Sequence, residues 1–495
     1  MRVPRAIVVC LVACAALGPG TTVGVSTAAQ SAEAAAWDSV LSLPVTPDLN
    51  PDPRVLEIRI EAYLAEVEVS PGRRITAWTY NGSIPGPLIR ARVGDRLIVH
   101  FTNRLPSPTT IHWHGLRIPI QMDGVPGHSQ PNVEPGESFT YDMVIPDAGL
   151  YWYHPHVMSA AQVGYGLYGA FLVDDPDEGF RVPDEHVLVL SDIDITENGT
   201  LGDPDTGGST GMAFGREGDT LLVNGRQHPT VSVPPGVPQR WRIVNAAKSR
   251  YFGLDAGAGQ MFTRIGGDGG LMESSVRTDF LVLAPGERAD VFFTPAGPAG
   301  SSLTIVAQLV DRGFGSTEAR VSQELMTLVM GAAASGRAAP LPVVARTIVP
   351  IDTTGATRVN LEFGINQDGR DKAFRYTING KPLGEFAPVP ARVGDTQIWT
   401  ITNNTPWSHP FHLHGFFFQV LDDKGAPVRP MEWKDTVNVP FKSKRSVIVR
   451  YDDRPGSWMF HCHVLDHADG GLMGTVALTR AGEPLPEPHK HSTER

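Results

Sequence analysis

The most constraining feature of this sequence is an internal duplication. Residues 91–115 and 391–415 both contain Ala-Arg-Val-Gly-Asp, then Thr-Asn, then His-x-His-Gly, and the matching positions lie 300 residues apart. A second match, 307 residues apart, joins residues 149–156 to residues 456–463, each beginning with Gly and ending with an aromatic residue and His-x-His. Constant register over such distances indicates duplicated domains.

A third and weaker copy lies between these two. Residues 224–245 contain Asn-Gly, a second Gly and an Asn, as do residues 81–103 and 379–403, and the second Gly precedes the Asn by nine residues in all three. The middle copy contains no His-x-His. The chain is therefore expected to hold three related domains, of which the middle one has diverged.

Each copy has the pattern of a Greek-key β-sandwich. Short runs rich in Val, Thr, Ile and Phe alternate with Pro-Gly, Asn-Gly and Asp-Gly turns. The 52 glycines and 42 prolines also favour an all-β chain over a helical one. We expect three consecutive β-sandwich domains at residues 38–176, 177–335 and 343–480.

The N-terminus resembles a secretory leader. Arg2 and Arg5 supply positive charge, an apolar run follows, and small residues at positions 26–28 offer a cleavage site, so residues 1–28 are predicted to be a signal peptide of a secreted or periplasmic protein. The apolar run is too short to span a bilayer. A lipoprotein-like box ending at Cys14 leaves a lipid anchor as a minor alternative. Cleavage at positions 26–28 leaves Cys462 as the single cysteine of the mature chain.

The histidines of the duplicated blocks predict metal sites. Four His-x-His pairs lie in these blocks, and on a strand residues i and i+2 point to the same face, so each pair can present two imidazoles to one site. Imidazole and thiolate suit copper or zinc. Zinc alone would not require ten histidines in two homologous domains, which favours copper.

Cys462 lies between two of these histidines. If His461 and His463 face one site, Cys462 must point to the opposite side of the strand. There it can join His409 and His467 in a trigonal arrangement of one thiolate and two imidazoles, as in a blue-copper centre. The cysteine would then link two metal sites through its neighbours and conduct electrons between them.

These motifs resemble those of the multicopper oxidases, in their three-domain, laccase-like bacterial branch. The four matching motifs are His112-x-His114, His154-x-His156, His409-x-x-His412-x-His414 and His461-Cys462-His463-x3-His467. The resemblance covers essentially the mature chain and implies three cupredoxin-like domains, with the type 1 copper in the third and no copper ligands in the second.

The resemblance also implies four copper ions and their ligands. Type 1 copper would bind His409, Cys462 and His467. Type 2 copper would bind His112 and His412. One type 3 copper would bind His114, His154 and His463, and the other His156, His414 and His461. Reductants would deliver single electrons to type 1 copper, and four electrons would reduce O2 to water at the three-copper cluster.

The axial position of type 1 copper departs from many bacterial relatives. Ten residues after Cys462, where they commonly have methionine, this chain has Leu472, followed by Met473. We take Leu472 as the axial neighbour. Loss of an axial donor should raise the potential of the copper, because Cu(II) is then less stabilised.

Acidic residues near the motifs are candidates for supplying protons. Asp123 lies eleven positions after the first motif histidine, as in the family, and is assigned as the proton relay. Many relatives have Glu after the last type 1 histidine, whereas here Ala468 and Asp469 follow, and Asp469 is the second candidate. Asp435 fits two interpretations equally, the orientation of a copper ligand or the capping of a turn.

The leading functional hypothesis is a laccase-like oxidase of phenols and aromatic amines. Alternatives are a cuprous-ion oxidase for copper tolerance, although the 12 methionines form no cluster, and a bilirubin-oxidase-like enzyme. A non-catalytic copper-binding protein should lack ligands, and none is missing; a copper nitrite reductase should have two domains. The partners expected are O2 and small aromatic reductants, and we expect a monomer. A net charge of −11 without a Lys/Arg cluster argues against a nucleic-acid partner.

Overall fold

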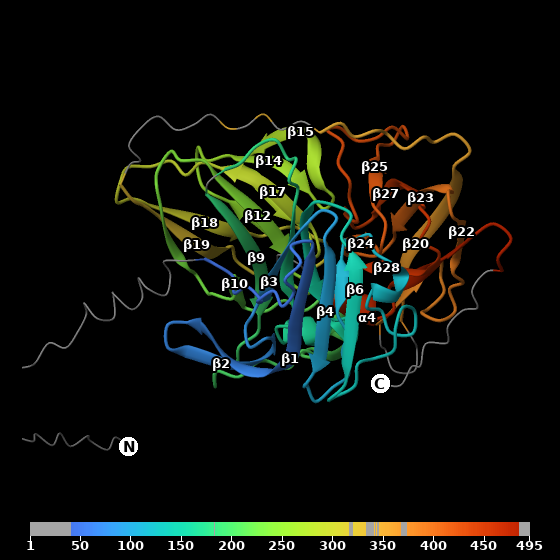
Figure 1. Cartoon of the computed structure of the whole chain (residues 1–495), viewed down its shortest axis with the longest axis horizontal. Coiled ribbons are helices and arrows are strands. Elements are labelled where there is room, and N and C mark those ends of the chain that lie inside the picture. The colour runs from blue at the N-terminus through green and yellow to red at the C-terminus, as the bar shows by residue number, and fades with distance from the viewer. Residues whose placement is uncertain are drawn as a thin grey trace, which may run out of the picture.

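The computed structural model describes residues 41–182, 184–315, 320–332, 341, 343, 346–367 and 374–484. The predicted signal peptide and Cys14 lie outside these residues. The chain is nearly all-β, and its strands form six sheets that make three consecutive sandwiches, which confirms the predicted fold class (Figure 1). The exact domain boundaries stay a prediction.

The first sandwich combines a sheet of order β2-β1-β4-β6 with one of order β3-β8-β7-β5. Its elements are β1 (Val55–Ser70), β2 (Arg73–Tyr80), β3 (Gly86–Arg92), β4 (Arg96–Asn103), β5 (His112–His114), η1 (Ile120–Met122), β6 (Ser138–Val144), β7 (Gly149–His154), α2 (Ser159–Gly164) and β8 (Gly169–Asp174). Alternating apolar side chains from both sheets form its core, such as Ile58 and Phe101 of the first sheet and Phe171 of the second.

The middle sandwich combines the sheets β10-β9-β12-β17-β14-β15 and β11-β19-β18-β13-β16. Its elements are β9 (Glu185–Ile193), α3 (Gly208–Phe214), β10 (Thr220–Val223), β11 (Thr230–Val233), β12 (Gln239–Asn245), β13 (Phe252–Asp255), β14 (Phe262–Gly267), β15 (Gly270–Thr278), β16 (Phe280–Leu283), β17 (Arg288–Phe293), β18 (Ser302–Gln308) and β19 (Gln323–Met330).

The third sandwich combines the sheets β21-β20-β23-β27-β25 and β22-β29-β28-β24-β26. Its elements are β20 (Thr357–Gln367), β21 (Phe374–Ile378), β22 (Val389–Arg392), β23 (Thr396–Asn403), β24 (His409–Leu413), β25 (Phe418–Leu421), β26 (Thr436–Val439), β27 (Ser443–Arg450), β28 (Gly456–Cys462), α4 (Leu465–Asp469) and β29 (Met473–Thr479). Two parallel strand pairings recur in all three sandwiches. The first is β1 with β4, β9 with β12 and β20 with β23. The second is β3 with β8, β11 with β19 and β22 with β29.

The repeated Asn-Gly sequence makes the same turn in all three sandwiches. Asn81, Asn224 and Asn379 have φ angles of 53°, 50° and 52°, in the left-handed region that asparagine tolerates better than most residues. The side-chain oxygen of each accepts a hydrogen bond at 2.7 Å from a backbone N–H of the opening strand of its sandwich. The second repeated asparagine is fully buried in each copy and donates to two backbone carbonyls in the first and middle copies and to three in the third. The middle copy therefore keeps the structural part of the repeat.

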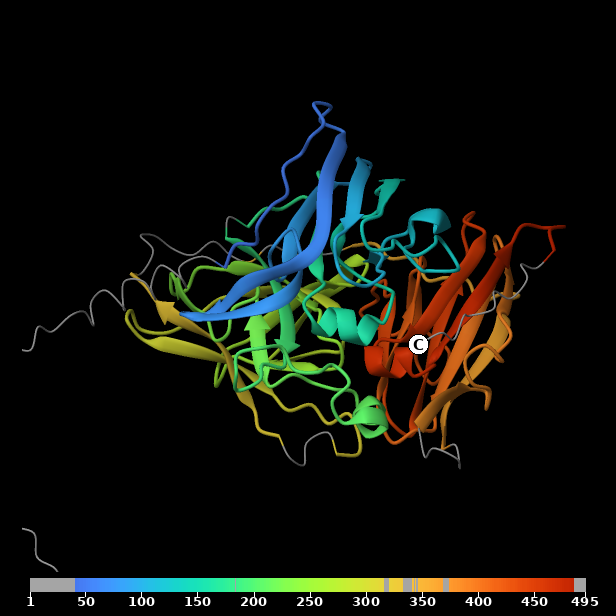
Figure 2. The same ribbon diagram turned by 90° about the horizontal axis from the view of Figure 1, so that it is seen from below.

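The three sandwiches contact one another pairwise. Strand β7 contacts β12 and β17, α2 contacts α4, and α3 contacts α4. Figure 2 shows the first sandwich, in blue and cyan, above the middle and third sandwiches. No helix of the described residues is both long and apolar enough to cross a membrane.

Candidate metal centre

Four strand segments bring eight histidines together between the first and third sandwiches. Strand β5, and β7 with the residues just after it, carry those of the first sandwich, and β24 and β28 with the residues just after them carry those of the third. His112 is paired with His154 across one sheet and His412 with His461 across the other. The other four are His114, His156, His414 and His463. All are buried except His156, which is half-buried.

The imidazoles of the two sandwiches face each other. His114 stacks on His412 with ring centroids 3.8 Å apart, and His112 stacks on His414 at 3.9 Å. Within this cluster, three sets of histidines have ring nitrogens within 4.8 Å of one another. These sets are His112, His114 and His412; His114, His154 and His463; and His156, His414 and His461. The last two match the type 3 sets implied by the resemblance.

Several ring nitrogens of these histidines have no hydrogen-bond partner among the described residues, which suits a metal cluster. His112 Nδ1 lies 2.7 Å from the backbone oxygen of Asp123, and His412 Nδ1 lies 3.0 Å from that of Asp435, whereas the buried Nε2 atom of each has no hydrogen-bond partner among the described residues. His154 follows the same pattern, with Nδ1 3.0 Å from the Pro155 oxygen. A buried nitrogen without a partner costs free energy, and a coordinated cation would remove that cost.

The second cluster has one sulfur and two nitrogens. Cys462 Sγ lies 3.3 Å from His409 Nδ1 and 3.6 Å from His467 Nδ1, and these nitrogens are 3.0 Å apart. All three residues are fully buried. On the other sides of the rings, His409 Nε2 lies 2.7 Å from Thr405 Oγ1 and His467 Nε2 lies 3.2 Å from the Ala213 oxygen of α3. Partners beyond the cluster thus fix both ring orientations.

Burial favours the neutral form of two of these histidines. Together with the nearby Arg312 for His409 and the nearby His112 for His414, it lowers the pKa of each imidazole to about 3. Burial also raises the pKa of the Cys462 thiol well above its usual range. Neutral imidazole is the form that binds metal, and a soft cation would displace the thiol proton. The residues present therefore fit copper.

Leu472 lies on the Cys462 side of the sheet. His461 is paired with Met473 across β28 and β29, so the side chains of these two residues point to one face of the sheet. Leu472, which precedes Met473, points to the other face, as Cys462 does. Leu472 is fully buried in the same core as Cys462, and its backbone oxygen accepts a hydrogen bond from the Cys462 N–H at 3.0 Å. Met473 is half-buried. This register supports Leu472 as the axial neighbour, which stays a proposal.

The two acidic candidates lie in different surroundings. Asp123 is buried at the end of η1, with Oδ2 2.8 Å from His414 Nδ1 and Oδ1 3.4 Å from His112 Nδ1. Burial raises its pKa, but His414 and His112 outweigh that effect and bring the pKa below its ordinary value. Asp469 is exposed at the end of α4 and accepts a hydrogen bond from the Ala160 N–H at 2.9 Å. Of these two candidates, Asp123 is the one that contacts the histidine cluster.

Asp435 also touches the cluster, which favours the ligand-orienting interpretation. Its Oδ1 lies 3.2 Å from His114 Nε2, and its carboxylate is paired with Arg288 of the middle sandwich. The sequence reasoning missed Arg288 entirely. No motif pointed to it, because the middle copy had lost its histidines and a lone arginine at the start of a strand is unremarkable.

The comparisons with known proteins agree with this geometry. Three family models, each described as multicopper oxidase, match residues 64–178, 184–329 and 354–481. "Multicopper oxidase MmcO" of Mycobacterium tuberculosis is 32% identical, over 91% of this chain and 90% of the relative. The laccase of Bacillus subtilis is 27% identical, over 83% and 91%. The structure of a Campylobacter jejuni multicopper oxidase, described as a metallo-oxidase, superposes with a TM-score of 0.79 at 26% identity, over 90% of this chain and 95% of that one.

Proposed function

Because this chain belongs to the multicopper oxidase family and is a copper-dependent oxidoreductase, we propose that it is a laccase-like enzyme. Its reductants would be phenols and aromatic amines, and its oxidant would be O2. When bound, four copper ions would supply the redox chemistry, in which four phenols and one O2 give four phenoxyl radicals and two waters. The leader predicted at residues 1–28 supports export, and we propose a monomer.

One observation carries this proposal. Cys462 is a member of the sulfur-containing cluster, while its neighbours His461 and His463 are members of the eight-histidine cluster. Three consecutive residues at the end of β28 thus join a site suited to single-electron transfer to a site with enough ligands for several metals. A copper-storage protein has no need of such a connection.

Aromatic side chains near the sulfur-containing cluster support aromatic reductants. Phe314 is 63% exposed, and its ring centroid lies 5.9 Å from that of Phe214. Phe214 lies 5.4 Å from Trp407, which lies 6.5 Å from the buried His467. A phenol stacked on Phe314 would therefore begin a series of rings that ends at a type 1 ligand.

Two carboxylates of the chain have proposed roles in the reaction at the copper sites. Asp123 contacts histidines from both halves of the cluster, so it can hold their orientation. A carboxylate beside the copper cluster can supply protons for the reduction of O2, and we propose Asp123 for that role. Asp469, which is exposed, is proposed only as a more distant source of protons.

A cuprous-ion oxidase is the second candidate. Met212 of α3 lies over α4, with Sδ 3.0 Å from the place where a Cβ on Gly470 would be. A thioether beside α4, the helix that contains His467, suits the binding of Cu(I). The Campylobacter jejuni relative, described as a metallo-oxidase, supports this candidate. The cuprous-ion candidate is thus supported by one thioether, whereas the laccase-like proposal is supported by the series of aromatic rings described above.

An oxygen-uptake assay distinguishes the two candidates. Copper-loaded protein is given a phenol, an aromatic amine, bilirubin or Cu(I) at equal reducing equivalents, and the ratio kcat/KM is measured for each. The laccase-like proposal expects phenols and amines to give the largest values. A clear preference for Cu(I) or bilirubin would replace it with the corresponding alternative.

A further inference from the structure

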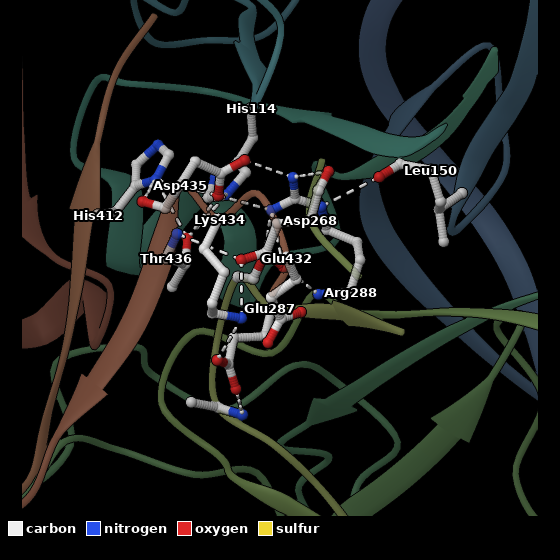
Figure 3. A network of polar contacts seen from close by, with 12 residues as sticks. His114, Leu150, Asp268, Glu287, Arg288, His412, Glu432, Lys434, Asp435 and Thr436 are labelled. Carbon is white, nitrogen blue, oxygen red and sulfur yellow. Dashed lines mark hydrogen bonds and ion pairs between the residues drawn. The ribbon is translucent and has the colours of Figure 1, made fainter. Parts of the chain in front are cut away.

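Arg288 is buried where the three sandwiches meet (Figure 3). All five N–H donors of its guanidinium have an acceptor. Nε donates to the Leu150 oxygen at 3.0 Å. Nη1 donates to the Gly286 oxygen at 3.0 Å and to Asp435 Oδ1 at 2.8 Å. Nη2 donates to the Asp268 oxygen at 2.9 Å and to Asp435 Oδ2.

The acceptors of Arg288 belong to three different sandwiches. Leu150 is in β7 of the first, Gly286 and Asp268 are in turns of the middle one, and Asp435 directly precedes β26 of the third. A planar guanidinium with five fixed donors can satisfy such a set, whereas an ammonium group cannot. Arg288 therefore fixes the place of the Asp435 carboxylate relative to the other two sandwiches.

Asp435 in turn contacts two histidines of the cluster. Its Oδ1 lies 3.2 Å from His114 Nε2 and 3.5 Å from His412 Nδ1. The hydroxyl of Thr436 lies within 3.2 Å of the same two nitrogens and donates to Asp435 Oδ1 at 2.8 Å. The opposite ring nitrogens, His114 Nδ1 and His412 Nε2, are buried without a hydrogen-bond partner among the described residues. Asp435 thus holds the outer nitrogens so that the inner ones point into the cluster.

We propose that Arg288 is a positioning residue for the copper cluster. Through Asp435, the middle sandwich sets the orientation of one histidine from the first sandwich and one from the third, although it supplies no ligand itself. This inference rests on the copper sites proposed above. It gives the diverged middle copy a role in the chemistry beyond connecting its neighbours.

The surroundings of this pair support a fixed arrangement. Asp268 Oδ1 accepts the backbone N–H of Arg288 at 2.9 Å, and its Oδ2 lies 3.1 Å from the ammonium of Lys434. Lys434 also lies 3.2 Å from Glu287, so every buried charge here has an opposite partner (Figure 3). Ligand-orienting partners of this kind typically contribute about 10- to 100-fold to metal affinity.

The test compares Arg288→Lys with Arg240→Lys in the copper-loaded enzyme. Arg240 is a matched control, because it is 2% exposed and also forks onto carboxylates, those of Glu178 and Asp290 in the middle sandwich. Among the described residues, neither of these carboxylates contacts a copper-ligand candidate. The measurements are copper retained against a competing chelator, the electron paramagnetic resonance spectrum of type 2 copper, and the blue absorption band of the Cys462 site.

Arg288→Lys is expected to weaken retention of cluster copper about 10- to 100-fold and to alter the type 2 spectrum. The blue band should be unchanged, because Cys462 lies in the other cluster. Arg240→Lys should change none of the three. Unchanged retention and spectrum in Arg288→Lys, or the same selective loss in Arg240→Lys, would overturn the inference.

A second variant keeps the test decisive if Arg288→Lys does not fold. Asp435→Asn keeps the size of the side chain but cannot accept both guanidinium hydrogen bonds, so it should produce the same selective change. A normal cluster in Asp435→Asn would overturn the proposed route. Wild-type protein that binds no copper at the histidine cluster would instead refute the proposed function, and the inference with it.

Discussion

Replacing Gly286 with alanine measures how closely the middle sandwich packs on the histidine cluster. Gly286 lies in the turn before β17, with φ at +85°. A Cβ at this position would lie 2.9 Å from two ring carbons of His463 and 3.1 Å from His114 Cε1. Both rings belong to the proposed copper sites, so they cannot move away without disturbing the ligand set.

Two terms set the size of the effect. A left-handed backbone costs alanine about 1–2 kcal/mol relative to glycine. Crowding in a packed core adds about 1–3 kcal/mol. The matched control is Gly236→Ala, in another turn of the same sandwich, where φ is +74° and no atom lies within 4 Å of the added Cβ. Gly236→Ala therefore carries the first term alone, and the two variants should differ by about 1–3 kcal/mol.

The assay is denaturant unfolding of the copper-free proteins, followed by copper analysis after reloading. Gly286→Ala should show the larger loss in free energy of unfolding and hold less copper in the histidine cluster. Gly236→Ala should bind copper as the wild type does. Equal destabilisation of both variants, with equal copper contents, would refute the reasoning, because it would mean that Gly286 does not press on the imidazoles.

Three further substitutions test the proposed sites. Leu472→Met should lower the reduction potential of type 1 copper, because a thioether stabilises Cu(II) more than a hydrocarbon does; a redox titration with no change or a rise would transfer the axial role to Met473, to be tested by Met473→Leu. Cys462→Ser should abolish the blue absorption band while most cluster copper remains, as metal analysis would show; a persistent band would contradict the assignment. Phe314→Ala should raise KM for aromatic reductants several-fold without altering the type 1 potential, whereas Phe280→Ala, at a surface phenylalanine that is 40% exposed, should leave KM unchanged; equal values for both variants would argue against docking at Phe314.

The motifs were predictable because each depends on local geometry. A His-x-His pair on a strand presents both rings to one face, and the alternation that aims His461 and His463 at one cluster aims Cys462 at the other. The recurrence of the Asn-Gly turn likewise depends on neighbouring residues of one sandwich. Such short-range rules can be applied to the sequence without knowing how the domains pack.

The surroundings of the motifs depend on contacts that no local rule encodes. The two interpretations of Asp435 could not be separated from the sequence, because its partner Arg288 lies 147 residues away in another sandwich. Asp123 matches a family spacing and Asp469 lies one residue beyond another, yet only the packing shows that Asp123 is buried against His414 and that Asp469 is exposed.

The sequence by itself determined the three β-sandwiches, and it supplied the copper-ligand candidates and their proposed division into two kinds of site. The tertiary structure alone decided that the middle sandwich reaches both sites, with Arg288 behind the histidine cluster and the Ala213 carbonyl beside His467. The physical reason is that strand periodicity acts over two residues, whereas a buried charge finds its partners wherever chain folding brings acceptors together.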